Sequence, residues 1–243
     1  MGPGRRSQGS VGAVPTPTTP RPARRRTPAP TTAAERRWWR EGARVAGIDE
    51  VGRGAWAGQL TVGAVALLPD RRVLGLRDSK QLTPDRRAQL AERLAGVADV
   101  GLGRVEVEEL DELGLAAALR VAAERAVVAL SEPPDVVLID GTVDLLADGR
   151  CSRELLVRGD QRSASIAAAS IAAKVARDAA MVAADADHPA YGFARHKGYP
   201  TAAHRAALAE HGPCRLHRRS WAPIAALSPP DPAAGREPRG RHV

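Results

Sequence analysis

The stretch GIDEVGRG, residues 47–54, places two adjacent carboxylates, Asp49 and Glu50, at the end of an apolar segment and directly before a Gly-Arg-Gly turn. The apolar segment predicts a strand, and carboxylates at a strand end can hold a divalent cation. Gly52 and Gly54 let the backbone approach a ligand closely, while Arg53 supplies a planar donor fork for phosphate. The stretch therefore indicates metal-dependent chemistry on a polynucleotide.

Positive charge is concentrated at the two ends of the chain. Residues 1–40 hold nine arginines and one acid and so carry +8, and residues 227–243 carry +1. Because the whole chain carries +8, residues 41–226 carry −1. The usual inference from a basic protein to nucleic acid therefore applies to the N-terminal segment, and the rest of the chain has to be judged from its site.

Composition divides the 243 residues into three parts. Residues 1–40 are rich in Pro, Thr and Arg and predict a disordered basic arm, residues 41–225 predict one folded domain, and residues 226–243 predict a disordered tail. The arm is either a solvated extension or an electrostatic arm that raises non-specific affinity for nucleic acid. Deleting it and titrating salt separates the two, since an unchanged affinity and salt slope would remove the second interpretation.

Other classes of protein are disfavoured by the composition. Cys151 and Cys214 are the only cysteines, so we expect neither a disulfide framework nor a thiolate metal site. The N-terminus has no apolar run of seven residues or more, so we expect no secretory signal and no membrane span. The chain is predicted to be a cytoplasmic monomer.

Strand and helix signals alternate between the two ends. The predicted strands are residues 44–48, 60–68, 100–107, 136–139 and 155–157, and the predicted helices are residues 84–94, 108–130, 163–181 and 201–210. Thr83 before Pro84 is a typical helix start, and Ser163 or Ser165 can cap the Ala-rich helix. The pattern predicts an α/β fold with a mixed sheet of about five strands flanked by helices.

Four acids share one local pattern, because Asp49, Glu50, Asp140 and Asp160 each lie beside glycine-containing turns at the end of a short apolar strand. Strand ends can converge in a sheet, so these groups could meet. Oxygen ligands without His or Cys spacing favour Mg²⁺ or Mn²⁺, and clustered carboxylates repel unless cations neutralise them. Two ions roughly 4 Å apart could activate a water and stabilise the leaving oxygen in phosphodiester hydrolysis.

Each of these residues also has a simpler explanation. An Asp beside Gly after a strand is most often a turn, and Asp49-Glu50 could be a solvated strand end. Lys80 is by default a surface lysine, although in the loop Asp78-Ser79-Lys80 it could offer a cation to phosphate. Ser163, Ala167, Ser170 and Lys174 form a stripe on one helix face that favours close packing. The joint occurrence of the acids favours a site.

The block YGFARHKGYPTAAH, residues 191–204, contains both tyrosines and the single Phe of a chain that is 3% aromatic. Aromatic rings beside cations suit stacking on sugars or bases. Rings that cover the edge of the core would give the same pattern.

Six segments occur in the order in which ribonuclease HII has them, and the chain resembles that family over residues 43–224. The segments are GIDEVGRG, LRDSKQLTPDRR, VLIDG, VRGDQRSASIAAASIAAKVARD, YGFARHKGYPTAAH and GPCRLHRRSW. The resemblance implies a ribonuclease H-like catalytic domain over residues 41–225 with a C-terminal helical part. It also implies endonucleolytic cleavage of RNA in RNA–DNA hybrids, including single ribonucleotides embedded in duplex DNA, that leaves 3′-hydroxyl and 5′-phosphate ends.

The resemblance also assigns roles to residues. It places the family's catalytic, metal-binding acids on Asp49, Glu50, Asp140 and Asp160, its ribonucleotide-sensing loop on Gly52, Arg53 and Gly54, its substrate-binding lysine on Lys80 and its junction-sensing tyrosine on Tyr199. The implied cofactor is Mg²⁺ or Mn²⁺. The chain departs from the family at Ala55 and Gln59, where prolines are usual, and at the bulky Trp56, which puts the rigidity of the loop in doubt.

Three alternatives are weighed against this assignment. The related ribonuclease HIII family generally lacks the arginine seen at Arg53 and carries a folded N-terminal domain. Another ribonuclease H-like nuclease, of the junction-resolving or transposase kind, should cut all-DNA substrates. A non-catalytic binder would not need four acids. Assaying duplex DNA that holds one ribonucleotide, with and without Mg²⁺, separates the enzyme from the last two.

Overall fold

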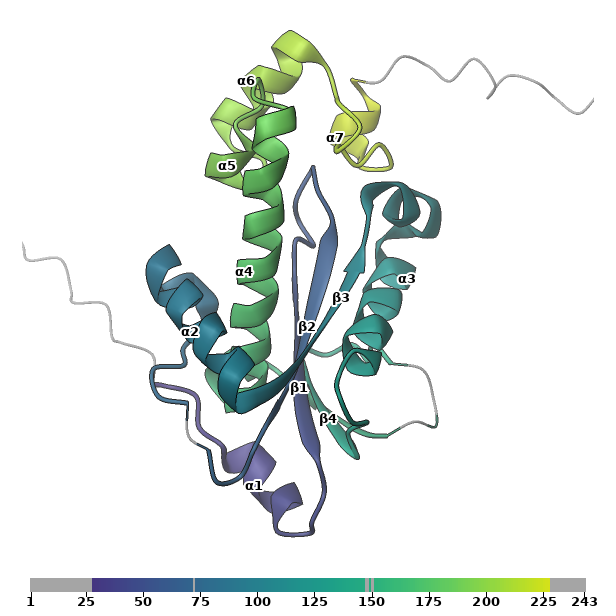
Figure 1. The fold of residues 1–243 in the computed structure, drawn as a ribbon. Coiled ribbons are helices and arrows are strands. Elements are labelled where there is room, and N and C mark those ends of the chain that lie inside the picture. Colours follow the sequence, from purple (N-terminus) through teal and green to yellow (C-terminus); the bar gives the residue numbers. More distant parts are fainter. Residues whose placement is uncertain (1–27, 72, 147–148, 150, 228–243) are drawn as a thin grey trace, which may run out of the picture.

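Strands from distant parts of the chain form a sheet at the centre of the molecule (Figure 1). The computed structural model describes residues 28–71, 73–146, 149 and 151–227, and over these residues the sheet has five strands. In spatial order they are β3 (Ala98–Val105), β2 (Leu60–Leu67), β1 (Val45–Val51), β4 (Val136–Asp140) and β5 (Ser152–Leu156). Because β3, β2 and β1 pair antiparallel whereas β1, β4 and β5 pair parallel, the predicted mixed sheet is confirmed.

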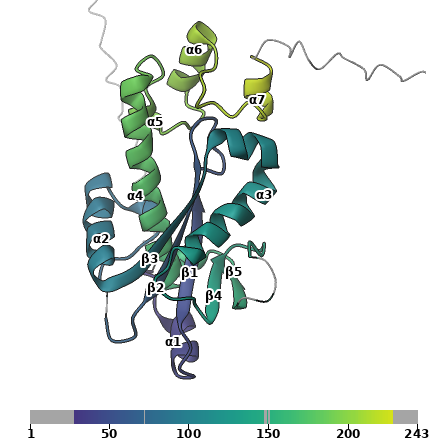
Figure 2. The same ribbon diagram turned by 45° about the vertical axis from the view of Figure 1, so that its right-hand side comes forward.

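Helices cover both faces of the sheet (Figures 1 and 2). α2 (Pro84–Val97) and α4 (Ala164–Asp187) lie on one face, and α3 (Val107–Val128) lies on the other. Alternate residues of β2 point to opposite faces, so Val62 and Ala64 pack with α3 while Val65 and Leu67 pack with α2 and α4. Two apolar layers therefore sandwich the sheet.

Small residues let α4 lie unusually close to the sheet. A Cβ atom on Gly47 would overlap the backbone of Ile166, and one on Gly63 would overlap the carbonyl oxygen of Ala169. The facing part of α4 is rich in buried alanines. This close approach sets the distance between the polar residues of α4 and the acids of β1.

Side-chain caps fix where the helices begin. Thr83 accepts a hydrogen bond from the backbone of Arg86 at the start of α2, and Ser163 accepts one from Ile166 at the start of α4. The predicted cap at Thr83 is confirmed, and of the two candidate serines Ser163 is the cap. Gly114 has a φ of 73° and kinks α3 near its start.

A small helical part stands beyond the sheet at the far end of α4 (Figures 1 and 2). It contains α5 (Phe193–His196), α6 (Ala202–His211) and α7 (Ala222–Ala225), which confirms the predicted C-terminal helical part. Two short 3₁₀ turns, η1 (Ser79–Gln81) and η2 (Gly159–Gln161), were not predicted. Over the described residues, none of the helices has the length and apolar character needed to cross a membrane.

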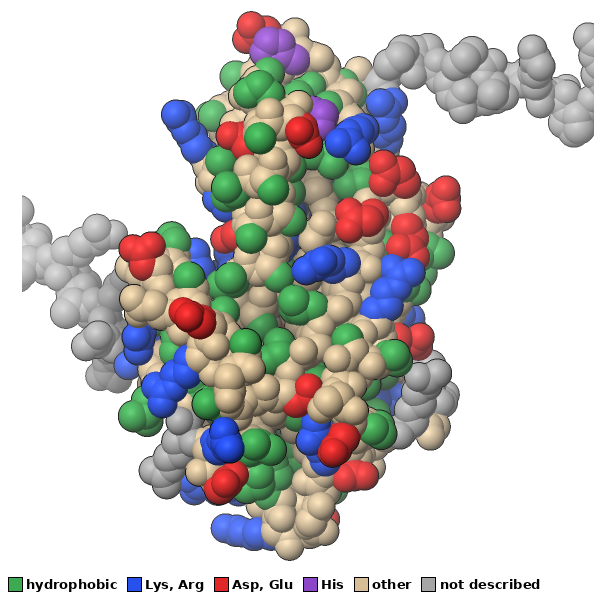
Figure 3. Space-filling view, viewed as in Figure 1, with side chains coloured by type: hydrophobic (Ala, Val, Ile, Leu, Met, Phe, Trp, Pro, Cys, Tyr) green, Lys and Arg blue, Asp and Glu red, His purple; other side chains and the backbone are tan. Residues whose placement is uncertain are grey.

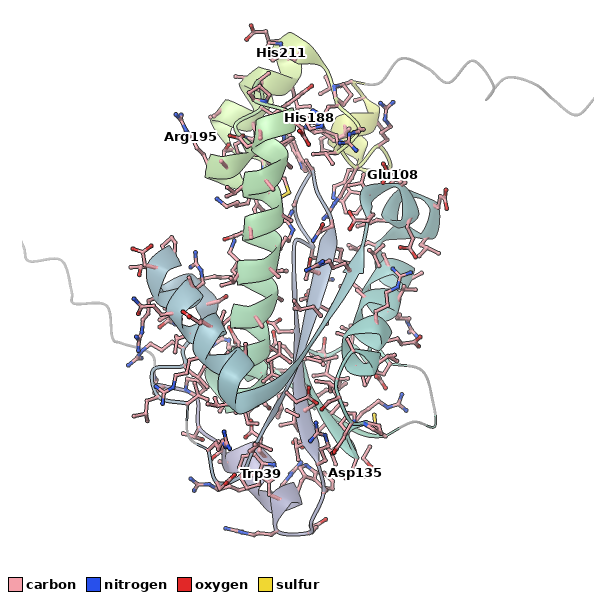
Figure 4. All side chains as sticks on the ribbon, in the orientation of Figure 1. Trp39, Glu108, Asp135, His188, Arg195 and His211 are labelled. Atoms are coloured by element: carbon pink, nitrogen blue, oxygen red, sulfur yellow. The ribbon has the colours of Figure 1, made fainter. Side chains whose placement is uncertain are left out.

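The prediction of a disordered arm over residues 1–40 is wrong for its last part. Residues 33–39 form α1 (Ala33–Trp39), which lies at the end of the molecule opposite His188 and His211 and carries the partly buried Trp39 (Figure 4). The many arginines around this segment favoured the prediction of disorder. Its tryptophans and its fully buried glutamate nevertheless pack against the domain. Residues 1–27 and 228–243 lie outside the described residues, so both terminal predictions stay predictions there.

Several strand boundaries differ from the prediction, most of all those of β1 and β5. β1 continues to Val51, so Asp49 and Glu50 pair with Gly63 and Val62 of β2 within the strand and not at a frayed end. The fifth strand is Ser152–Leu156, although residues 155–157 were expected. It is an edge strand with polar side chains, so an apolar run does not mark it.

Charged side chains of both signs are interspersed over the face shown in Figure 3. This distribution agrees with the small net charge of residues 41–226. Recognition of nucleic acid by the folded domain must therefore come from local groups and not from a broad basic surface.

Candidate active site

The carboxylates predicted from the sequence come from neighbouring elements. Asp49 and Glu50 lie on β1, Asp140 ends β4, and Asp160 lies in η2, which follows β5. β1 and β4 are parallel, and Ile48 pairs with Ile139, so Asp49 and Asp140 follow at the same level of the sheet. The acids of β1 and β4 therefore lie on adjacent strands at one level, although Asp49 and Glu50 lie within β1 and not at its end.

One pocket of about 480 Å³ is lined by every residue that the sequence predicted for the site. It is lined by Asp49, Glu50, Gly52, Arg53, Gly54, Lys80, Asp140, Asp160 and Tyr199, together with Val51, Ser79, Ser170 and Lys174. Ser170 and Lys174 belong to the helix stripe that was interpreted as close packing. The structure shows that half of that stripe faces the pocket instead.

Burial dominates the electrostatics of the β1 acids. Burial, followed by the negative charges of Glu50 and Asp140, raises the pKa of Asp49 to about 8, although hydrogen bonds from Ser170 and from the backbone of Glu50, the latter 2.8 Å long, oppose this shift. A cation bound nearby would favour the charged form of Asp49.

The neighbouring carboxylates show the same tendency more weakly. Burial raises the pKa of Glu50, and Arg53, whose Nη1 lies 3.6 Å from Glu50 Oε1, counteracts it. Burial and the charges of Asp78 and Asp140 raise the pKa of Asp160, which Lys80 opposes. A pocket of mutually repelling, partly dehydrated carboxylates favours a bound cation.

The turn after β5 connects Asp140 to Asp160. The backbone N–H of Gly159 donates a 2.6 Å hydrogen bond to Asp140 Oδ1, and Asp160 is the next residue. In the described part of the chain, no three His, Cys, Asp or Glu side chains lie close enough together to hold a metal ion as they stand. The carboxylates are electrostatically coupled, and a shared ion would require them to move inward.

Arg177 was not selected from the sequence, yet it joins two walls of the pocket. Its fully buried guanidinium donates hydrogen bonds of 2.8–3.0 Å to the carbonyl oxygens of Gln59, Ala57 and Lys197. It also lies over the ring of Tyr199, 5.4 Å from the centroid. Gly52, with a φ of 94°, has to be glycine because a Cβ there would overlap the Arg177 side chain.

A second buried arginine holds the same loop from the C-terminal part. Arg218 donates two hydrogen bonds, of 3.0 and 2.8 Å, to the carbonyl oxygen of Gly58. Burial lowers its pKa to about 9. Arg177 and Arg218 thus hold the carbonyl groups of Ala57, Gly58 and Gln59, which supplies rigidity close to where the expected prolines are missing. An arginine in a sequence is normally read as a surface residue, so no pattern marked either one.

The aromatic block over residues 191–204 divides into two roles. Tyr191 and Phe193 stack on each other with their centroids 5.3 Å apart and form the core of the C-terminal part. Tyr199 alone among them lines the pocket. His204 is fully buried and hydrogen-bonds through Nδ1 to the carbonyl oxygen of Tyr199, which fixes the turn that carries this ring.

A carboxylate pocket at the central strands of a mixed sheet, with helices on both faces, defines a nuclease of the ribonuclease H type. The family model described as Ribonuclease HII matches residues 46–224. The chain belongs to the ribonuclease HII family. It is accordingly a metal-dependent ribonuclease H, an endonuclease of RNA–DNA hybrids.

Relatives and solved structures agree with this assignment. The chain is 49% identical to the ribonuclease HII of Nitrosococcus oceani over 189 residues, which is 75% of this chain and 90% of that one. It is 52% identical to the ribonuclease HII of Moorella thermoacetica over 195 residues, 78% of this chain and 92% of that one. The crystal structure of ribonuclease H2 from Pyrococcus horikoshii superposes with a TM-score of 0.62 at 27% identity, covering 76% of this chain and 96% of that one.

Proposed function

We propose that this enzyme hydrolyses the phosphodiester on the 5′ side of a ribonucleotide, both in RNA–DNA hybrids and at single ribonucleotides embedded in duplex DNA, leaving 3′-hydroxyl and 5′-phosphate ends. Its role would be the removal of misincorporated ribonucleotides by a cytoplasmic monomer. The observation that carries the proposal is the meeting of the acids, the glycine loop and Tyr199 in one pocket.

The residues that would hold the metal are Asp49, Glu50, Asp140 and Asp160. Their side chains offer only oxygen donors, which suits Mg²⁺ or Mn²⁺. Burial and the charges of Glu50 and Asp140 raise the pKa of Asp49, and a bound cation would oppose that rise. Two such ions, when bound, supply an activated water and a Lewis acid for the leaving oxygen. The acids must approach one another to do this, and the hydrogen bond from Gly159 to Asp140 makes the η2 turn part of that movement.

Discrimination between RNA and DNA would fall to the glycine loop. The 2′-hydroxyl is the group that separates the two at one nucleotide, so a contact to it must carry the selectivity. Arg53 is largely exposed, with 61% of its side chain accessible, and the Cβ position of Gly54 has no described atom within 4 Å. Arg53 lies 3.6 Å from Glu50 through Nη1, yet its exposed fork and the open backbone at Gly54 would be accessible to a ribose and its phosphate.

Tyr199 and Lys80 would position the rest of the strand. The Tyr199 ring lies beside Lys174, whose Nζ is 5.9 Å from its centroid, and would pack against the neighbouring deoxyribose. Lys80 would contact a phosphate next to the acids. Its backbone N–H is held by the Asp78 carboxylate at 2.9 Å, so the loop that presents it is ordered.

The decisive experiment is cleavage of a DNA duplex that contains one ribonucleotide, compared with an all-DNA duplex and a long RNA–DNA hybrid, with and without Mg²⁺. The proposal expects Mg²⁺-dependent cutting 5′ to the ribonucleotide and none of the all-DNA duplex. Cleavage of all-DNA substrates would favour a junction-resolving or transposase-type nuclease. Binding without cleavage at any Mg²⁺ concentration would favour a non-catalytic binder.

A further inference from the structure

Glu35 is a fully buried carboxylate supplied by α1, outside the residues that the ribonuclease HII family model matches. Its Oε1 accepts three hydrogen bonds, from Ser163 Oγ at 2.6 Å and from the backbone N–H and Oγ of Ser165 at 2.8 Å each. Its Oε2 is buried with no hydrogen-bond partner among the described residues. A carboxylate is costly to bury, so a segment that served only as a solvated arm would not place one here.

The position of these donors explains what the carboxylate stabilises. Ser163 is the N-cap of α4, and the first turn of this 24-residue helix contains no acidic residue of its own. A helix N-terminus favours a negative charge because its first N–H groups point toward it. Glu35 therefore supplies, from a distant part of the sequence, the anion that the start of α4 lacks.

The same contacts continue into the active site. Thr31 pairs with Ser163, and its carbonyl oxygen accepts a 2.9 Å hydrogen bond from Ala164. Ser163 in turn donates through its N–H to the carbonyl oxygen of Gly159 at 2.8 Å, and the N–H of Gly159 donates to Asp140 Oδ1. An unbroken run of hydrogen bonds thus joins Glu35 to the turn of residues 159–163, which contains Asp160 and holds Asp140.

We propose that Glu35 is a positioning residue for the metal pocket: its carboxylate fixes the 159–163 turn, so that Asp140 and Asp160 are presented together to the divalent ions. The inference rests on the proposed function for the assignment of these two acids as metal ligands. Residues 31–39 would then contribute to metal binding by the catalytic domain.

The test uses the full chain with Glu35→Ala, Glu35→Gln and the matched control Arg37→Ala. Arg37 lies on the same helix and pairs with Glu154 of β5, away from the 159–163 turn. Mn²⁺ binding is measured by calorimetry without substrate, and cleavage is measured against Mg²⁺ concentration, both well below the melting temperature of every variant.

We expect Glu35→Ala to weaken Mn²⁺ binding and to raise the half-saturating Mg²⁺ concentration by roughly ten-fold. This is the lower end of the loss in metal affinity that is typical when a residue that orients metal ligands is replaced. Glu35→Gln, which keeps the shape and one acceptor but not the charge, should give a smaller shift, and Arg37→Ala should change neither value.

Unchanged metal affinity in Glu35→Ala, even with a lower melting temperature, would overturn the proposal and leave a purely structural role. If Glu35→Ala does not fold, unchanged metal affinity in Glu35→Gln overturns it instead. Should the wild-type chain cleave nothing, the proposed function fails, whereas Mn²⁺ calorimetry still tests the positioning role.

Discussion

Asp140 stands at the centre of the carboxylate pocket because it contacts the η2 turn and repels both acids of β1. Replacing it by Asn removes the charge but keeps an oxygen that can accept the hydrogen bond from Gly159. We expect Asp140→Asn to lower kcat by roughly 10²-fold or more, the cost of losing a preorganised charge at a reacting centre, while the melting temperature changes little.

Single-turnover cleavage and thermal unfolding measure the two effects of Asp140→Asn. Asp144→Asn is the matched control, since Asp144 pairs with Arg153 and does not line the pocket. Normal turnover of Asp140→Asn would reject the metal-ligand assignment.

Tyr199 offers a second test at the residue scale. Its ring lines the pocket, whereas Tyr191, the other tyrosine, belongs to the core of the C-terminal part. Stacking of an aromatic ring is worth about 1–3 kcal/mol, so Tyr199→Ala should lower kcat/KM on single-ribonucleotide duplexes by roughly ten-fold or more. Tyr191→Phe should retain activity. Equal activity of Tyr199→Ala and wild type on these substrates would reject the sensing role.

The residues of the candidate site were predictable to different degrees. The acids and the glycine loop follow strands or turns, so their type and place in the sequence predicted them. Lys80 and Tyr199 received their roles from the resemblance to a known family. Arg177 and Arg218 do not, because their function depends on being buried against carbonyl groups that only the fold assembles. Ser170 and Lys174 were attributed to close packing, since a helix stripe alone does not tell which part of it meets a neighbour and which faces a pocket.

At the scale of elements, α4 joins the acids that we propose bind metal to the residues that we propose sense the substrate. It carries Ser170 beside Asp49 and, two turns later, Arg177 beneath the glycine loop and the Tyr199 ring. Arg177 on this helix therefore helps to limit movement of the loop relative to Tyr199.

Arg177→Lys tests that connection. Lysine cannot satisfy three carbonyl oxygens at once, and each buried group left unpaired costs about 1–3 kcal/mol. We expect a lower free energy of unfolding by about 2–4 kcal/mol, measured in urea, and a larger loss of kcat/KM on single-ribonucleotide duplexes than on long hybrids. Arg93→Lys, on the exposed face of α2, is the control. A variant with wild-type stability and substrate preference would show that Arg177 does not couple the glycine loop to Tyr199.

Sequence patterns located most of the elements because apolar periodicity and caps are local signals. Thr83 and Ser163 mark the starts of α2 and α4 without reference to the rest of the fold. η1 and η2 are too short to show a period, and β5 is an edge strand whose outward residues are polar. α1 was missed because its stability comes from Glu35 and two tryptophans contacting distant parts of the chain.

At the scale of the whole molecule, the boundary of the folded domain lies further toward the N-terminus than composition suggests. Residues 1–27 contribute six arginines and no acid. Residues 28–40 include α1 and Glu35, whose carboxylate contacts the start of α4. Deleting residues 1–27 should leave the melting temperature unchanged. Deleting residues 1–40 should lower it by about 10 °C, since the contacts of two partly buried tryptophans and of Glu35, together worth several kcal/mol, are lost.

The same pair of deletions tests the charge of the N-terminal segment. If residues 1–27 contact phosphates, their removal reduces the slope of log affinity against log salt concentration for a plain DNA duplex. An unchanged slope would identify this segment as a solvated extension. Equal melting temperatures for the two deletions would contradict the structural role of α1.

The proposed activity requires that acids from β1, β4 and η2 share divalent ions in one pocket. Anomalous diffraction from crystals grown with Mn²⁺ tests this directly. We predict a manganese peak about 2.0–2.3 Å from carboxylate oxygens of Asp49 and Asp140, with Glu50 and Asp160 drawn toward the pocket. Manganese bound only elsewhere on the protein, with these four carboxylates still apart, would contradict it.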